Sequence, residues 1–415
     1  KKLMELGGTG SHTYWCPLVP MGKFLMYVGS SAAAQTKVSD SPAFGTMAPP
    51  TVERKSIMLL TNEGGKLAIA GEVDTGTHIG WIQHHPTNGH LYAVGGGRVR
   101  AYRVVGPSGL VEEFSSADAL GNPAHFELSL DGAWALVANY SASTIAVLPI
   151  LADGSIGDAT DSKFHCIKPI PSLSDRQECS HPHQIRLAPR HGRFALVCDL
   201  GADRVWVYVF DASRGALAGA ANSVRHLAFP EGSGPRHLDF HPNGRWVFVL
   251  CELSGEVATC SWDADEGILL HSSSVPALPQ GVNPCRAHHS GNAHILVSPS
   301  GRNVYASTRT DGAIAVFSVD EVSGALTRLQ HIDTCGVCPR NFVLGYSSSD
   351  GWVPSPGHVA AGHLHVGNQD SQSIATFAID GAGQLIGPPS ILSIPGVCPN
   401  VLTAPTPAQA MPVAL

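Results

Sequence analysis

Short runs of alternating apolar and polar residues, separated by turns that carry glycine, recur through most of the chain. Each glycine turn is followed by an apolar run such as 245–250, then a second turn and another run such as 256–262. A period of two residues, bounded by Gly, Asn and Asp, is typical of antiparallel strands joined by hairpin turns. Five turns hold their glycine at the same point of the pattern: Asn88-Gly89, Asp131-Gly132, His191-Gly192, Asn243-Gly244 and Ser300-Gly301.

The spacing of these turns predicts the fold class. The turn glycines are 43, 60, 52 and 57 residues apart, and a sixth, less regular copy runs over residues 340–385. Four short strands in each interval, with no helical period, are the signature of a β-propeller blade. A two-sheet sandwich is the alternative, but sandwiches rarely repeat a whole four-strand unit six times.

The two ends of the chain supply a further blade. Strand patterns at 23–29, 56–61 and 66–70 precede the six copies, and Asn400-Val-Leu-Thr-Ala404 resembles the first strand of a copy. We therefore predict an all-β, seven-bladed β-propeller with four antiparallel strands per blade. In it, the N- and C-terminal strands together close the first blade and remove a free edge.

Residues 1–415 are expected to form this single propeller domain. The repeat leaves out an irregular N-terminal segment 1–22 and insertions at about 31–55 and 345–360. It also leaves out a Pro/Ala-rich tail, 403–415.

Composition narrows the function classes. The net charge is −7 and charged residues make up 14% of the chain, which argues against binding to nucleic acid, because that requires a basic surface. A small anion held by a local arginine cluster remains compatible with this charge. No apolar run approaches 18 residues, so we expect no membrane span.

The ten cysteines indicate a reducing compartment. Cys335 and Cys338 form a lone CxxC without a second pair, so a cysteine zinc site is not expected. Cys198, Cys251 and Cys260 fall inside apolar strands, where a reduced thiol behaves as a small hydrophobe. We expect a cytoplasmic protein. Because the chain does not begin with Met, an organelle lumen after removal of a targeting segment is the alternative.

A ring of polar residues lies seven positions before the turn glycines. His125, His237 and His294 fall there directly, His183 does so if two residues are inserted, and Asn341 is the counterpart in the sixth copy. The first strand of a propeller blade lines the channel, so these side chains would surround one mouth. Histidines in a ring could bind a metal. We favour instead hydrogen bonds to the neighbouring blade, with His183 as the exception and no metal or cofactor, since residues present in every blade usually serve the shared architecture.

The residues eight positions after the turns differ from blade to blade. They are Tyr140, Leu200, Glu252 and Arg309, so the repeat itself requires no charge there. A charge that departs from a structural repeat indicates a functional site. Together with Arg236 on the preceding strand, the set contains two arginines, a carboxylate and a nearby histidine. The alternative is an ion-pair network between blades.

Several motifs resemble those of the propeller lactonase family. That family includes bacterial 6-phosphogluconolactonases of propeller type and fungal carboxy-cis,cis-muconate lactonizing enzymes, and the resemblance covers about residues 78–395. The motifs are Gly-Asn-Pro-Ala-His125, His181-Pro-His-Gln184 with Cys198-Asp-Leu-Gly-Ala-Asp-Arg-Val205, Gly232-Ser-Gly-Pro-Arg-His237, Glu252-Leu-Ser254 and Cys338-Pro-Arg-Asn-Phe342.

The resemblance implies which residues act. It places the family's histidine on His183, its arginines on Arg236 and Arg309, and its carboxylate on Glu252. The chain departs from the family pattern at Cys251, where Asn is usual, and at Ser307-Thr-Arg309, where Ser-Asn-Arg is usual. The two insertions also have no counterpart.

These residue types suit the opening of a lactone by water. Glu252 or His183 would activate the water, and Arg236 and Arg309 would hold the anion and the developing oxyanion. The remaining expected substrate-binding residues are His237, Arg340, Asn341, His125 and His294.

We therefore expect a metal-independent lactonase acting on a small anionic sugar lactone such as 6-phosphogluconolactone. One alternative is a carboxymuconate cycloisomerase, since the lactonizing members run a related reaction in the cyclising direction. The other is a non-catalytic propeller scaffold that binds protein partners through its insertions.

Overall fold

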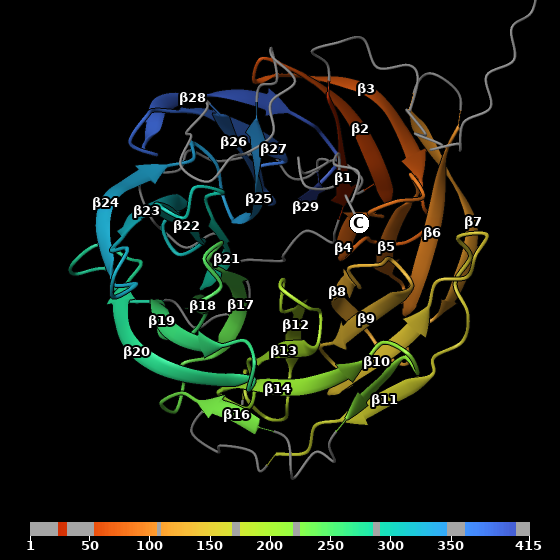
Figure 1. Cartoon of the computed structure of the whole chain (residues 1–415). Helices are drawn as coiled ribbons and strands as arrows, with labels where there is room; N and C mark the ends of the chain where they lie inside the picture. The colour runs from red at the N-terminus through yellow and green to blue at the C-terminus, as the bar shows by residue number, and fades with distance from the viewer. Residues whose placement is uncertain are drawn as a thin grey trace, which may run out of the picture.

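The computed structural model describes residues 24–30, 54–105, 109–167, 175–218, 225–284, 291–346 and 362–403. Figure 1 shows the strands arranged as seven sheets around a central axis, and all strand pairs within the sheets are antiparallel. The predicted seven-bladed β-propeller is confirmed.

The blades follow the chain order. Blade 1 contains β29 (Pro399–Thr403), β1 (Phe24–Ser30), β2 (Ser56–Glu63) and β3 (Lys66–Asp74), and blade 2 contains β4 (Trp81–His84), β5 (Leu91–Gly95), β6 (Arg98–Val105) and β7 (Leu110–Asp118). Blade 3 contains β8 (Pro123–Leu128), β9 (Trp134–Asn139), β10 (Thr144–Pro149) and β11 (Asp161–Phe164). Blade 4 contains β12 (Pro182–Leu187), β13 (Phe194–Asp199), β14 (Arg204–Asp211) and β15 (Ala216–Ala218), with β16 (Arg225–Ala228) also paired to β14.

The last three blades contain four strands each. Blade 5 contains β17 (Pro235–Phe240), β18 (Trp246–Cys251), β19 (Glu256–Asp263) and β20 (Ile268–Pro276). Blade 6 contains β21 (Asn292–Val297), β22 (Asn303–Thr308), β23 (Ala313–Val319) and β24 (Leu326–Asp333). Blade 7 contains β25 (Pro339–Tyr346), β26 (Gly362–Asn368), β27 (Ser373–Ile379) and β28 (Leu385–Ser393).

The two ends of the chain meet in blade 1, as predicted. The last strand, β29, pairs with β1, with Val28 opposite Leu402 and Gly29 opposite Val401. In Figure 1 these two strands, from opposite ends of the colour scale, lie side by side. This pairing gives blade 1 its innermost strand and leaves no open edge between the first and last blades.

The core consists of apolar layers between neighbouring blades. Leu196 of blade 4, for example, belongs to the same buried cluster as Val249 of blade 5. The second strands β13 and β22 are buried at every position. The expected alternation of inward and outward residues is therefore wrong for these strands, because a neighbouring blade covers each of their faces. Outer strands such as β20 expose most of their residues.

Some sequence expectations concern segments outside the described residues. These are residues 1–22, most of the insertions at 31–55 and 345–360, and nearly all of the tail 403–415. Among the residues that are described, no helix is long and apolar enough to cross a membrane.

Candidate active site

A β-bulge marks the N-terminal end of the innermost strand in several blades. In blade 5 the strand ladder skips Arg236. In blades 3, 4 and 7 it skips Ala124, His183 and Arg340. A bulge re-aims the extra side chain and is often found at the rim of a site. All four bulge residues line one pocket, at the channel mouth where these strands begin.

This register corrects one alignment made from the sequence. The sequence comparison grouped His183 with the channel histidines, but in the ladder of blade 4 it is Gln184 that takes the place of His237. His183 corresponds instead to Arg236. Blade 4 has extra residues before its turn glycine, so counting back from that glycine placed His183 one position away from its true partner in the ladder.

Two residues of the channel ring bond the neighbouring blade. The Gln184 side-chain oxygen accepts a hydrogen bond from the backbone N–H of Leu238, at 2.6 Å. The Asn341 oxygen accepts one from Leu402, at 2.9 Å. The first bond joins blade 4 to blade 5, and the second joins blade 7 to the closing strand of blade 1. The expected hydrogen bond to the neighbouring blade is therefore present at Asn341, which also lines the pocket. Gln184, in the position that the sequence had assigned to His183, makes a bond of the same kind, whereas neither ring nitrogen of His125 has a hydrogen-bond partner among the described residues.

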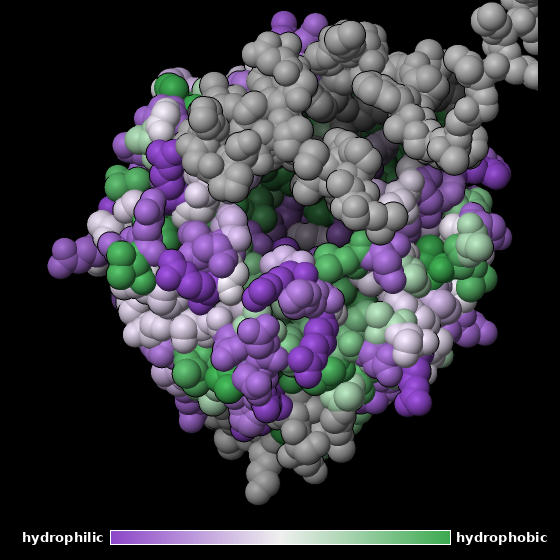
Figure 2. All heavy atoms as spheres, in the orientation of Figure 1, coloured by the Kyte–Doolittle hydropathy of each residue, from purple (hydrophilic) through white to green (hydrophobic). Residues whose placement is uncertain are grey.

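A second set of pocket residues follows the second strand of each blade. Tyr140, Glu252 and Arg309 come directly after β9, β18 and β22 and line the pocket, which has a volume of about 570 Å³. Figure 2 shows a hollow at the centre of the ring of blades. A cavity of this size suits a small-molecule ligand.

Glu252 is the centre of the pocket's charged groups and is 2% exposed. Its Oε2 lies 2.8 Å from Arg236 Nε, and its Oε1 lies 3.0 Å from an Arg309 terminal nitrogen. Arg176 donates a hydrogen bond to Oε1. Burial opposes ionisation, but the three guanidinium groups hold the pKa of the Glu252 carboxyl well below its usual range. Glu252 is therefore an anion that orients three cations.

Arg176 is a site residue that the sequence reasoning missed. It lies between β11 and β12, in a connection longer than those that precede β8, β17 and β25, and it lines the pocket. Its neighbour Gln177 fixes the segment by donating hydrogen bonds to the Leu200 carbonyl at 2.7 Å and to Asp203 at 2.8 Å. An arginine inside a polar insertion was the only sequence signal.

The pocket carries a strong positive excess. Its described lining residues include four arginines, at 176, 236, 309 and 340, but a single carboxylate, Glu252. Burial, followed by the charge of Arg236, lowers the pKa of His183 well below its usual range. Burial and the charge of Arg236 also lower the pKa of His237 well below its usual range. Both imidazoles are therefore neutral at pH 7, and the excess of three positive charges favours an anionic ligand.

His237 connects the pocket to the channel. The guanidinium of Arg236 can only donate, so His237 Nε2 accepts its hydrogen bond, at 3.3 Å. The other ring nitrogen of His237 then carries the proton and donates to His294 Nδ1, at 2.8 Å. This chain of bonds fixes the orientation of the guanidinium beside Glu252.

His125 and His294 lie in the channel and do not line the pocket. Trp81, which the sequence reasoning also missed, packs between them, with ring centroids 4.2 Å from His125 and 5.7 Å from His294. Phe342 packs on the other side of His294, at 5.0 Å. The expectation that these two histidines bind substrate directly is not matched by their position, because packed rings separate them from the pocket.

Acidification below about pH 6.5 is expected to destabilise the fold. Burial is the first cause of a lowered pKa at His84 (to about 4), His365 (to about 3), His125 and the other channel histidines. Unfolded histidine titrates near 6.5, so below that pH the unfolded chain binds more protons than the folded one. The free energy of unfolding should then fall by up to about 1.4 kcal/mol per pH unit for each such histidine.

Thermal unfolding of a His125→Phe variant between pH 7.5 and 5 checks this account. Within the described structure, neither ring nitrogen of His125 has a hydrogen-bond partner, so phenylalanine keeps the packing and removes one titrating group. The pH dependence should become shallower by about one proton. His271→Gln, a change at an exposed position, is measured beside it as the control. An unchanged slope in His125→Phe would contradict the assignment.

Fold and pocket together define a propeller with an arginine-rich small-molecule site, and the comparisons with known proteins agree. The family model described as "Lactonase, 7-bladed beta-propeller" matches residues 44–390. The chain belongs to this lactonase family.

Individual relatives of known name are also lactonases. The 6-phosphogluconolactonase of Bacillus subtilis is 30% identical over 322 residues, which are 76% of this chain and 84% of the relative. That of Pectobacterium carotovorum is 30% identical over 322 residues, covering 76% of this chain and 89% of the relative. Among solved structures, the periplasmic gluconolactonase of Pseudomonas aeruginosa matches with a TM-score of 0.73 and 25% identity, over 92% of this chain and 99% of that one.

Proposed function

We propose that this protein hydrolyses an anionic sugar lactone, and that 6-phosphogluconolactone is its substrate. The observation that carries the proposal is the excess of guanidinium groups in the pocket, four around one carboxylate. A phosphate monoester and a developing oxyanion are the two negative groups of this reaction, and planar guanidinium groups bind both in a bidentate manner. The names of the relatives support the same reaction class.

His183 is the proposed general base. Each oxygen of Glu252 already faces a guanidinium group, and its lowered pKa makes it a weak proton acceptor. His183 is neutral and lines the pocket. A water held by its imidazole can transfer a proton to the ring as the water oxygen attacks the lactone carbonyl.

The arginines stabilise the oxyanion and bind the phosphate. Attack of water gives a tetrahedral oxyanion, which Arg236 and Arg309 stabilise through donors already oriented by Glu252. Collapse of this intermediate breaks the bond to the ring oxygen. The departing oxygen takes the proton from His183, which leaves the open-chain acid and a neutral imidazole. Arg340, on the bulge of blade 7, would bind the substrate phosphate.

The test is an assay of purified protein on freshly generated 6-phosphogluconolactone, with formation of the acid followed by a coupled dehydrogenase. The spontaneous rate is the blank, and we expect hydrolysis well above it. A rate equal to the blank would exclude this substrate. In the same series, turnover of carboxymuconate followed by ultraviolet absorbance would favour the cycloisomerase, and inactivity on both substrates would favour a scaffold.

A further inference from the structure

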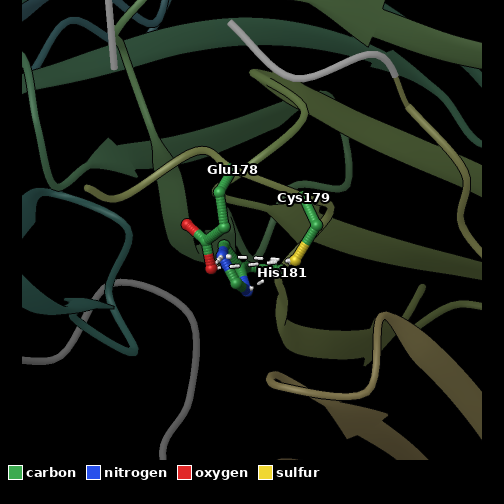
Figure 3. Close-up of side chains that lie close together, drawn as sticks. All are labelled: Glu178, Cys179 and His181. Carbon is green, nitrogen blue, oxygen red and sulfur yellow. Dashed lines mark hydrogen bonds and ion pairs between the residues drawn. The ribbon is translucent and has the colours of Figure 1, made fainter. Parts of the chain in front are cut away.

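A second group of reactive side chains lies beside the pocket without lining it. Glu178, Cys179 and His181 belong to the segment that leads into β12, and none of them is among the pocket residues. Figure 3 shows their carboxylate, thiol and imidazole groups turned toward one another. In the described part of the chain, these are the only residues of the Cys, His, Asp and Glu types that gather three ligand atoms within 4.8 Å of one another.

The separations between the ligand atoms match those around a tetrahedral metal. His181 Nε2 lies 3.0 Å from Glu178 Oε1 and 3.7 Å from Cys179 Sγ, and Sγ lies 3.8 Å from the same oxygen. Zinc bonds of about 2.0–2.3 Å at tetrahedral angles place such ligand atoms about 3.3–3.6 Å apart. A zinc ion therefore requires shifts of only a few tenths of an ångström.

The imidazole of His181 is oriented as a metal ligand. Its Nδ1 lies 3.0 Å from the backbone carbonyl of Tyr140, which can only accept, so Nδ1 carries the proton. Nε2 is then the ring nitrogen that faces the thiol and the carboxylate, and a metal ion there would replace the proton that Nε2 shares with Glu178. A ligating histidine typically donates its second ring N–H to a carbonyl in this way. The Tyr140 ring stacks on His181, at 4.3 Å between centroids, and holds the plane of the imidazole.

The backbone on both sides of the cluster is already fixed. The N–H of His181 donates to Asp199 Oδ1, at 2.8 Å, and Ser180 donates to the other oxygen of Asp199. Gly201 packs so closely on the Cys179 carbonyl that an added Cβ would lie 1.8 Å from its oxygen. Because the main chain is already held in place, binding a metal would cost little additional conformational entropy.

From this geometry we infer that Glu178, Cys179 and His181 form a zinc site at the rim of the active-site pocket. The mixture of sulfur, nitrogen and oxygen ligands suits Zn²⁺ and excludes Mg²⁺ and Ca²⁺, which take oxygen. Glu178 is 52% exposed, so solvent reaches the site and a water completes the fourth position. Binding converts the thiol to a thiolate and releases its proton to solvent.

The consequence is a more rigid segment beside the active site. The metal would fix the stretch 178–181, which follows Arg176 and whose His181 ring stacks on Tyr140. Both Arg176 and Tyr140 line the pocket. The ion takes no part in the lactone chemistry. It fixes the wall of the pocket, and the inference stands whether or not the proposed substrate is correct.

Titration of the full chain with Zn²⁺, after dialysis against a chelator and in competition with a chromophoric metal indicator, tests the site. We expect one equivalent to bind. Cys179→Ser should weaken binding by at least about 100-fold and Glu178→Gln by about 10-fold. Cys335→Ser removes an exposed cysteine outside the cluster and should bind zinc as the wild type does. Co²⁺ should give a thiolate-to-metal charge-transfer band that is absent in Cys179→Ser.

The readout does not depend on activity. Since Glu178 is exposed, Glu178→Gln will fold even if a change at Cys179 proves disruptive. Binding of less than half an equivalent of Zn²⁺ by the wild type would overturn the inference. Equal zinc affinities for Cys179→Ser and Cys335→Ser would also overturn it. The contact between His181 and Glu178 would then be an ordinary ion pair.

Discussion

Replacing Arg236 with alanine is expected to lower kcat/KM for 6-phosphogluconolactone by about 100- to 1000-fold, as for the loss of other oxyanion donors. Arg236 is 2% exposed, lies on the bulge of blade 5, and holds Glu252 Oε2 at 2.8 Å. It also donates to the carbonyl of Ala293 and to His237. Its guanidinium is thus oriented before substrate arrives, which is the condition for a strong effect on the transition state.

Two variants control this experiment. Arg236→Lys keeps the charge but loses the planar fork, so it should recover little activity. Arg245 lies in the same blade and is oriented away from the pocket, with one hydrogen bond to the Glu321 carbonyl at 3.0 Å; Arg245→Ala should behave as the wild type. Steady-state kinetics with circular dichroism as a folding check measure all three. An Arg236→Ala enzyme within threefold of wild type would show that this arginine does not act on the reaction.

Glu252→Gln is expected to lose both stability and activity. The carboxylate offsets three guanidinium groups in a buried site, and removing one member of a buried ionic network typically costs about 3–5 kcal/mol of unfolding free energy. With their common acceptor gone, the arginines lose their orientation, so kcat should fall by at least about 100-fold.

Glu256→Gln is the matched control, because Glu256 is four residues away and half-buried but outside the pocket. Denaturant unfolding should separate the two variants clearly, with Glu256→Gln close to wild type. If Glu252→Gln kept wild-type stability and lost only activity, the carboxylate would be acting as a base and the positioning role argued here would be wrong.

The sequence predicted the fold well because the repeat determines it. Turn glycines and the strand patterns between them gave the number of blades, and the pattern at 400–404 gave the closing strand that the structure shows as β29. The fourth strand of blade 3, β11, pairs with β10 through backbone bonds, which leave no trace in residue choice.

The charged residues of the site were also predictable in part. Glu252 and Arg309 stood out because the repeat has no need of a charge after the second strand. Arg236 and Arg340 gained a common explanation only from the structure, since a bulge is a matter of strand register and not of composition. Counting residues from the turns therefore misaligned His183 by one position.

Arg176 shows the limit of that reasoning. It belongs to an irregular segment whose course depends on hydrogen bonds from Gln177 to the turn after β13. No period in the sequence links this segment to Glu252, 76 residues away along the chain. Only the folded ring of blades brings the two residues together.

The most direct test of the account is the ratio of kcat/KM for 6-phosphogluconolactone to that for the uncharged glucono-δ-lactone, measured on the wild-type protein. Four arginines around one carboxylate should make the enzyme prefer the phosphorylated lactone by at least about 100-fold, since a charge-assisted bidentate contact is worth roughly 3 kcal/mol. Equal values for the two lactones would contradict the claim that the arginine excess selects an anionic substrate.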